Sequence, residues 1–139
     1  MSLLYKPSDT RTSIGLLFLR LVAGTAFMMH GWPKFQHAFN WMGADAPVPG
    51  WLQSLAAFSE FGGGLAWILG LFTPLASFGL LCTMSFATFV HVSKGDPFVG
   101  MEGHYEPALL YLSISLLLML AGPGKFSLDA KLFGNRSSK

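Results

Sequence analysis

The 139-residue sequence is poor in charge. Asp, Glu, Lys and Arg make up 12% of it, against about 25% in an ordinary soluble domain. Hydrophobic residues make up 52%. So few charges cannot cover a water-facing surface, which argues against an ordinary soluble enzyme and against a disordered segment. The net charge of +2 forms no basic patch and argues against nucleic-acid binding.

The sequence is equally poor in cysteine and in cofactor motifs. Cys82 is the one cysteine, so an intrachain disulfide is excluded, and with it a thiol–disulfide relay within the chain. Zinc sites built from several cysteines are excluded for the same reason. The glycines at 62–64 are followed by neither Lys-Ser nor Lys-Thr, so they form no phosphate-binding loop.

Most of the sequence consists of four apolar segments. They cover about residues 13–30, 51–72, 74–92 and 106–121. A helix that spans a membrane needs about 20 mostly apolar residues; the first three segments reach this length and the fourth is short. None has a polar face of the width that a soluble bundle needs. The sequence therefore predicts an all-α, four-helix transmembrane bundle, a single domain over residues 1–139 in the lipid bilayer.

The basic residues are distributed unevenly between the two ends of this expected bundle. Four spans place both termini on one side, and that side holds Lys6, Arg11, Lys125, Lys131, Arg136 and Lys139. The opposite side holds Lys34 and Lys94. Cytoplasmic segments of membrane proteins are enriched in Lys and Arg. We therefore expect both termini in the cytoplasm, and the connections 31–52 and 93–106 on the outer side.

Small residues recur at four-residue intervals in the second and third segments. They are Gly62, Ala66, Gly70, Gly79, Thr83 and Ala87. Stripes of this kind let membrane helices approach one another closely. We expect them to be the faces through which the helices pack.

Two formal charges, Arg20 and Glu60, lie well inside the expected spans. A charge in the hydrocarbon region costs about 2.5–3.5 kcal/mol on insertion scales and usually has a partner. Because the two charges are opposite, we expect an ion pair between them, across a difference in depth of roughly 5–10 Å at 1.5 Å per residue. Such a pair would either hold the helices in register or face a polar site, and the sequence leaves both readings open.

Further polar side chains gather where the spans meet the outer side. They are His30, Lys34, His91, Lys94 and Glu106. Histidine and carboxylate beside an apolar cavity suit proton transfer, because burial and neighbouring charges move their pKa values toward neutrality. Basic side chains suit a small anion or the carbonyl oxygens of a quinone, and the aromatic residues nearby suit a flat apolar ligand.

These residue types predict a polar pocket that opens to the outer side and binds a quinone or a small anion. We expect the catalytic proton transfers to be carried out by Glu60, His30 and His91. We expect the ligand to be bound by Arg20, Lys34 and Glu106. A haem between the two histidines, or a metal held by them and the two glutamates, suits the pattern less well. We assign no metal ligand, and the cofactor that the pattern suits is a quinone.

The order and spacing of four motifs resemble the DoxX family of small bacterial membrane proteins. The resemblance covers about residues 17–132. It rests on LRLVAGTAFMMHGWPKF with Arg20, His30 and Lys34, on EFGGGLAWILGLFTPLAS with Glu60, on His91, and on GPGKFSLD after the last span. It implies a multi-pass four-helix bundle in the bacterial cytoplasmic (inner) membrane. It also implies a link to redox chemistry, since some relatives are described as subunits of quinone-reducing thiosulfate oxidoreductases and others are associated with oxidant-defence or thiol-handling complexes.

We therefore expect a membrane subunit of an oxidoreductase system that works with a partner subunit of a redox complex or as a homo-oligomer. Two other functions remain open: a transporter or permeability protein for a small solute, and a non-enzymatic assembly subunit. The absence of a cysteine pair, a nucleotide loop and a metal motif means that no residue pattern favours catalysis by the isolated chain.

Overall fold

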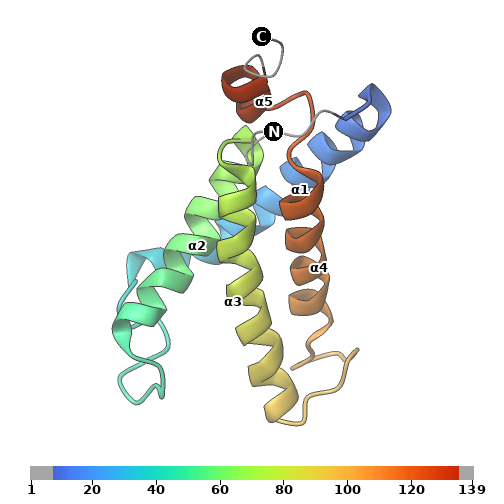
Figure 1. Cartoon of the computed structure of the whole chain (residues 1–139). Helices are drawn as coiled ribbons and strands as arrows, with labels where there is room; N and C mark the ends of the chain where they lie inside the picture. Colours follow the sequence, from blue (N-terminus) through green and yellow to red (C-terminus); the bar gives the residue numbers. More distant parts are fainter. Residues whose placement is uncertain (1–7, 135–139) are drawn as a thin grey trace.

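The computed structural model describes residues 8–134, and every regular element in that range is a helix. In chain order they are α1 (Thr10–Gln36), α2 (Gly50–Leu69), α3 (Thr73–Ser93), α4 (Glu106–Ala121) and the short α5 (Leu128–Phe133). Figure 1 shows the first four as long rods and α5 as a single short coil at one end. The all-α class is confirmed for the described residues.

The first helix is longer than expected. It begins at Thr10 and continues to Gln36, so the expected loop from residue 31 was wrong in its first six positions. At the start, the Asp9 carboxylate accepts hydrogen bonds from Thr12, and these hold the pKa of that carboxyl below its ordinary value. Near the end, Gly31 lies directly against the backbone of α2 at Phe61, and the helix continues through Pro33.

The helices pack in sequence order, with α1 against α2, α2 against α3, and α3 against α4. Trp67 of α2 is fully buried at the centre. Its ring meets the edge of Phe27 at 5.4 Å between centroids, and its indole N–H donates to the Ser77 hydroxyl at 2.9 Å. Leu16, Leu80 and Leu118 complete this core from the other three long helices.

The tightest crossing joins α1 and α2, and it does not use the small-residue stripes. A Cβ on Gly24 would lie 2.7 Å from the carbonyl oxygen of Gly64, and a Cβ on Gly64 would lie 2.7 Å from that of Gly24. Gly62 has nothing within 4 Å of such a position. The expected packing role was wrong for Gly62, because two residues correspond to about 200° of rotation and place Gly64 on the opposite face. It holds for Gly70, which packs against Arg20 and Ser127, and for Gly79, which packs against Ser59 of α2.

Arg20 does not pair with Glu60, so the expected ion pair was wrong. Its guanidinium, 1% exposed, donates to the carbonyl oxygens of four residues: Trp67, Ile68, Pro123 and Phe126. Helical side chains tilt toward the N-terminus of their own helix. Because α1 and α2 are antiparallel, Arg20 and Glu60 tilt away from each other.

The segment after α4 closes the same end of the bundle. Asp129 of α5 is fully buried, and its carboxylate accepts the backbone N–H groups of Phe72 and Thr73 at 2.7 and 2.8 Å, which caps the start of α3. Ser127 in turn caps α5 through the Ala130 N–H. The start of α1, the α2–α3 turn and α5 thus meet at one end of the bundle, which we call the closed end (Figure 1).

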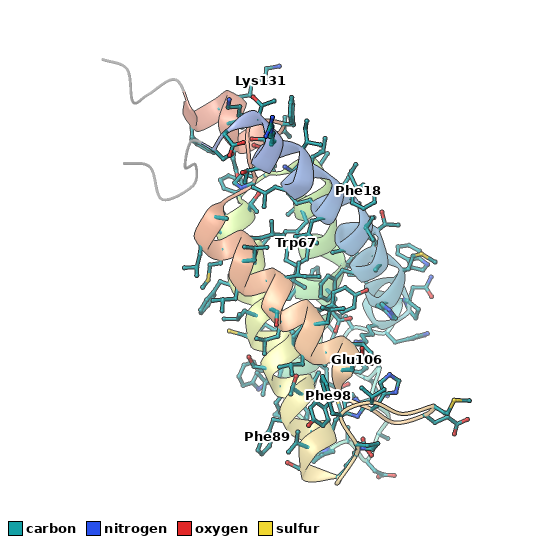
Figure 2. All side chains as sticks on the ribbon, turned by 90° about the vertical axis from the view of Figure 1, so that its right-hand side faces the viewer. Phe18, Trp67, Phe89, Phe98, Glu106 and Lys131 are labelled. Atoms are coloured by element: carbon teal, nitrogen blue, oxygen red, sulfur yellow. The ribbon has the colours of Figure 1, made fainter. Side chains whose placement is uncertain are left out.

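The exterior of the bundle is rich in exposed hydrophobic side chains. Phe18 is 70% exposed and Phe89 is 66% exposed, and Figure 2 shows both directed away from the buried Trp67. Among the described residues, α1 and α3 are long and apolar enough to cross a membrane, and α4 is apolar but shorter. The four-span path and the cytoplasmic termini stay predictions, and Lys6, Arg136 and Lys139 lie outside the described residues.

Candidate functional site: a groove between α2 and α3

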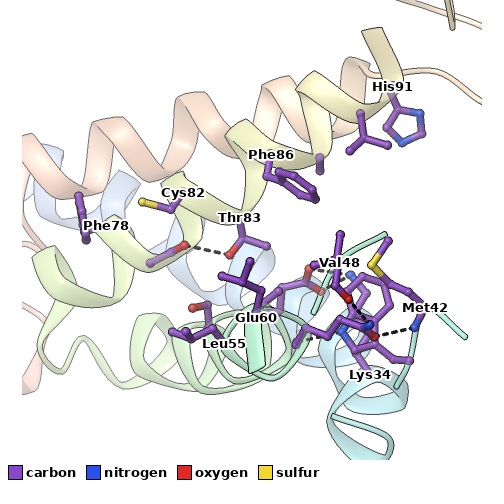
Figure 3. Close-up of a pocket in the computed structure, with 18 of the residues that line it drawn as sticks. Lys34, Met42, Val48, Leu55, Glu60, Phe78, Cys82, Thr83, Phe86 and His91 are labelled. Atoms are coloured by element: carbon purple, nitrogen blue, oxygen red, sulfur yellow. Dashed lines mark hydrogen bonds and ion pairs between the residues drawn. The ribbon is translucent and has the colours of Figure 1, made fainter. Parts of the chain in front are cut away.

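A groove of about 800 Å³ lies between α2, α3 and the connection that joins α1 to α2 (Figure 3). Phe78, Cys82 and Phe86 of α3 form one wall, and Leu55 and Glu60 of α2 form the other. Most of the lining is apolar, and the volume falls within the range of about 300–1,000 Å³ that is usual for small-molecule sites. The groove is therefore large enough for an organic ligand.

One ion pair lies in the wall of this groove. The Lys34 ammonium contacts both carboxylate oxygens of Glu60, at 2.6 and 2.7 Å. The Glu60 side chain is only 3% exposed and that of Lys34 is 28% exposed. The Trp41 ring covers the ammonium, with its centroid 4.6 Å from Nζ. Lys34 meets Glu60 because its side chain tilts back along α1 toward the middle of the bundle.

The connection between α1 and α2 is held over the groove by Gln53, a buried residue of α2. Its side-chain amide donates to the Val48 carbonyl at 2.8 Å and accepts the Met42 N–H at 3.0 Å. The Trp41 indole N–H donates to the Gln53 carbonyl at 2.9 Å. These three bonds position the residues that cover the ion pair. The sequence interpretation missed Gln53, although a glutamine in an apolar segment was a usable signal.

His91 lies at the other end of the α3 wall (Figure 3). Its Nδ1 is 2.7 Å from an Asp96 carboxylate oxygen, which orients the ring and leaves Nε2 without a bond in the described part of the chain. A histidine oriented in this way can accept or release a proton at Nε2. The sequence interpretation missed Asp96, whose signal is its place five residues after His91, just past the end of α3.

The structure brings together three of the six expected site residues. Lys34, Glu60 and His91 line one groove. Arg20 lies at the closed end, whereas His30 and Glu106 are exposed and do not line the groove. Among residues 8–134, no three His, Cys, Asp or Glu side chains are grouped closely enough to hold a metal ion.

The helical bundle, its apolar exterior and its ligand-sized groove define a small integral membrane protein with a candidate binding site. The chain belongs to the DoxX family, whose model matches residues 15–92. That range contains every residue that lines the groove. The resemblance seen in the sequence is thereby confirmed.

Two relatives align over most of their length. An uncharacterized protein of Haemophilus influenzae is 36% identical over 121 residues, which cover 85% of this chain and 90% of that protein. The inner membrane protein YqjF of Escherichia coli is 32% identical over 127 residues, which cover 86% of this chain and 92% of that protein. No solved structure matches the chain. The family and these relatives identify a protein of the bacterial inner membrane.

Proposed function

We propose that the chain is a membrane subunit of an oxidoreductase system and that it binds a quinone in the groove between α2 and α3. The observation that carries this proposal is the ion pair of Lys34 with the nearly buried Glu60 in the wall of an apolar groove. A charged pair inside a lipid-facing cavity is costly and is more often functional than incidental. It supplies a polar anchor within an otherwise apolar site.

The chemistry of the lining suits a quinone head. A quinone ring is flat and apolar, and its two carbonyl oxygens accept hydrogen bonds. Lys34 is a charged donor in the groove wall with the Trp41 ring over it, and Phe78 and Phe86 offer aromatic surface on the α3 wall of the groove. A small anion, the other ligand that the sequence suggests, would meet the Glu60 carboxylate beside Lys34 and be repelled.

The proposed division of labour follows from the balance of the reaction. Reduction of a quinone to a quinol takes two electrons and two protons. We assign the proton transfers to Glu60 and His91 of the groove lining, with His91 exchanging protons with water through its Nε2. The electrons would come from the redox group of a partner subunit, which makes this chain the quinone-binding member of a complex.

Cys82 offers a direct test, because it is the one cysteine of the chain and lines the groove. The full chain in lipid nanodiscs would be titrated with a short-tailed ubiquinone analogue. The extent of Cys82 alkylation by N-ethylmaleimide would be followed by mass spectrometry. A bound head beside Glu60 should protect the thiol in a saturable manner. Alkylation that does not change with quinone would contradict the proposal.

A variant of the ion pair tests whether quinone binding depends on Lys34. Lys34→Met should weaken quinone binding about tenfold or more, since it removes the charged donor from the groove wall. Lys94→Met is the matched control, because Lys94 is an exposed lysine at the end of α3 that does not line the groove. Equal affinity in all three proteins would contradict the role of Lys34. Flux of a small solute through liposomes without quinone binding would favour the transporter reading instead.

A further inference from the structure

We infer that the quinone bound in this groove carries a long isoprenoid tail, and that the tail lies between α2 and α3 on its way toward the closed end. The inference rests on the proposed function and adds the length and shape of the ligand. It concerns the region between α2 and α3 beyond the ion pair, where the sequence analysis predicted that small residues pack the helices together.

The first observation is that the groove does not end at the ion pair. A second hollow of about 330 Å³ continues along the same two helices. Leu55, Ser59, Leu75 and Gly79 line both hollows. Together they extend from His91 near the end of α3 to the α2–α3 turn at Leu71 and Phe72. The sixteen residue steps from Leu75 to His91 correspond to about 24 Å of helix.

The second observation is the character of the lining in this continuation. No charged residue lines the second hollow, and Ser59 is its one hydroxyl-bearing residue. Small residues widen it, since Gly62, Ala66, Ala76 and Gly79 contribute no side chain or only a methyl group. A Cβ on Gly62 would meet nothing within 4 Å. Gly62, Ala66 and Gly79 of the two expected packing stripes thus line an apolar hollow next to the groove. The two hollows adjoin where Gly79 faces Ser59, whose hydroxyl oxygen would lie 3.1 Å from a Cβ on Gly79.

The third observation concerns what can enter this space. Bulky exposed side chains flank it: Phe58 and Phe72 are 55% and 45% exposed, and Leu75 is 68% exposed. They hold the backbone of another helix away from the small residues, whereas a thin flexible chain can pass between them. At the polar end, Glu60 already neutralises Lys34, so the anionic phosphate of a phospholipid would meet a carboxylate. A neutral head with one apolar tail fits both ends.

Gly62→Leu is the variant that tests the tail without disturbing the head. The new side chain would occupy the second hollow, and the open space around Gly62 lets the helices keep their positions. Gly15→Leu is the matched control, because Gly15 of α1 is also without neighbours within 4 Å and lines neither hollow. Both proteins and the unmodified chain would be compared in nanodiscs of one lipid composition.

The probes are two ubiquinones with the same head, one with a short tail and one with a long isoprenoid tail, compared at equal mole fraction in the lipid. The unmodified chain and Gly15→Leu should bind the long-tailed form about tenfold more tightly, which corresponds to about 1.4 kcal/mol. Gly62→Leu should lose this advantage and bind the short-tailed form as before.

The outcomes separate this inference from the proposed function. If the short-tailed form binds and neither tail length nor Gly62→Leu changes affinity, the tail site is overturned while the quinone site stands. If neither form binds, both are overturned. Native mass spectrometry would detect a different occupant of the second hollow. A bound phospholipid that is lost in Gly62→Leu and is not displaced by quinone would overturn the tail site. A dimer that dissociates in Gly62→Leu would overturn it as well.

Discussion

Arg20 and Lys34 of α1 have different roles because their side chains reach different parts of the bundle. Arg20 reaches the closed end and donates five hydrogen bonds to four carbonyl oxygens. Lys34, almost four turns later, reaches Glu60 and the groove. The planar guanidinium suits several carbonyls at fixed angles, and the compact ammonium suits one carboxylate. Arg20 therefore stabilises the fold, and Lys34 belongs to the candidate site.

Arg20→Lys tests this separation. A lysine has three donors, so at least two of the five hydrogen bonds would be lost and at least one of the four carbonyl oxygens would lose its bond to this side chain. We expect a loss of about 3 kcal/mol in the free energy of unfolding, measured by circular dichroism in detergent. Quinone binding per folded molecule should stay unchanged.

The control for this prediction is Arg11→Lys, the same exchange at an exposed arginine at the start of α1, which should have little effect on stability. If Arg20→Lys abolished binding and left the unfolding transition in place, Arg20 would be a ligand-binding residue, as the sequence pattern first suggested.

The residues of the site were easier to find from sequence than their partners. Glu60 and Lys34 stand out because a charge in or beside an apolar segment is conspicuous. Their pairing depends on the antiparallel tilt of two helices, which charge and depth alone do not reveal. Asp129 was missed as a structural residue because the capping of α3 from a segment 56 residues away is a tertiary contact.

At the scale of the elements, α2 has two faces with opposite uses. Gly64 meets the backbone of α1, and Gly62 lines the second hollow. Both lie in one run of three glycines, so composition cannot distinguish them. The helical rotation between them decides which is a contact and which is a cavity wall.

An alanine at each position gives a direct comparison. In Gly64→Ala the new Cβ would lie 2.7 Å from the Gly24 carbonyl oxygen and 2.9 Å from the Met28 nitrogen. Because backbone atoms cannot move aside cheaply, the loss in stability should be about 1–3 kcal/mol. Gly62→Ala meets open space and should be neutral or gain up to about 1 kcal/mol from helix propensity. Unfolding midpoints in the same detergent provide the measurement, and similar destabilisation by both changes would contradict the assigned faces.

At the scale of the whole molecule, the two ends of the bundle are built differently. At the closed end, Arg20 donates hydrogen bonds to backbone carbonyl oxygens, and Asp129 accepts hydrogen bonds from backbone N–H groups. The opposite end holds the connections between α1 and α2 and between α3 and α4, and the polar part of the groove opens there. Figure 2 shows Lys131 and Glu106 at these opposite ends. The distribution of basic residues predicts that the closed end faces the cytoplasm.

Cysteine labelling in cells tests this orientation. In a Cys82→Ser background, Met101→Cys and Lys131→Cys place one thiol at each end, both at exposed positions. A membrane-impermeant maleimide should label the first in intact spheroplasts and the second only after permeabilisation. The reverse pattern would invert the orientation, and labelling of both from the outside would contradict a membrane crossing by α4, the long helix between them.

The apolar composition alone was enough to place the chain in a membrane as a helical protein, because charge content and segment length follow directly from residue identity. The family motifs and three residues of the groove were also recognisable along the chain. Only the tertiary structure decided that Lys34, and not Arg20, pairs with Glu60, and that Gly62 lines a hollow while Gly64 packs against α1. Both depend on how antiparallel helices tilt and rotate against each other, and that geometry arises only when the helices pack.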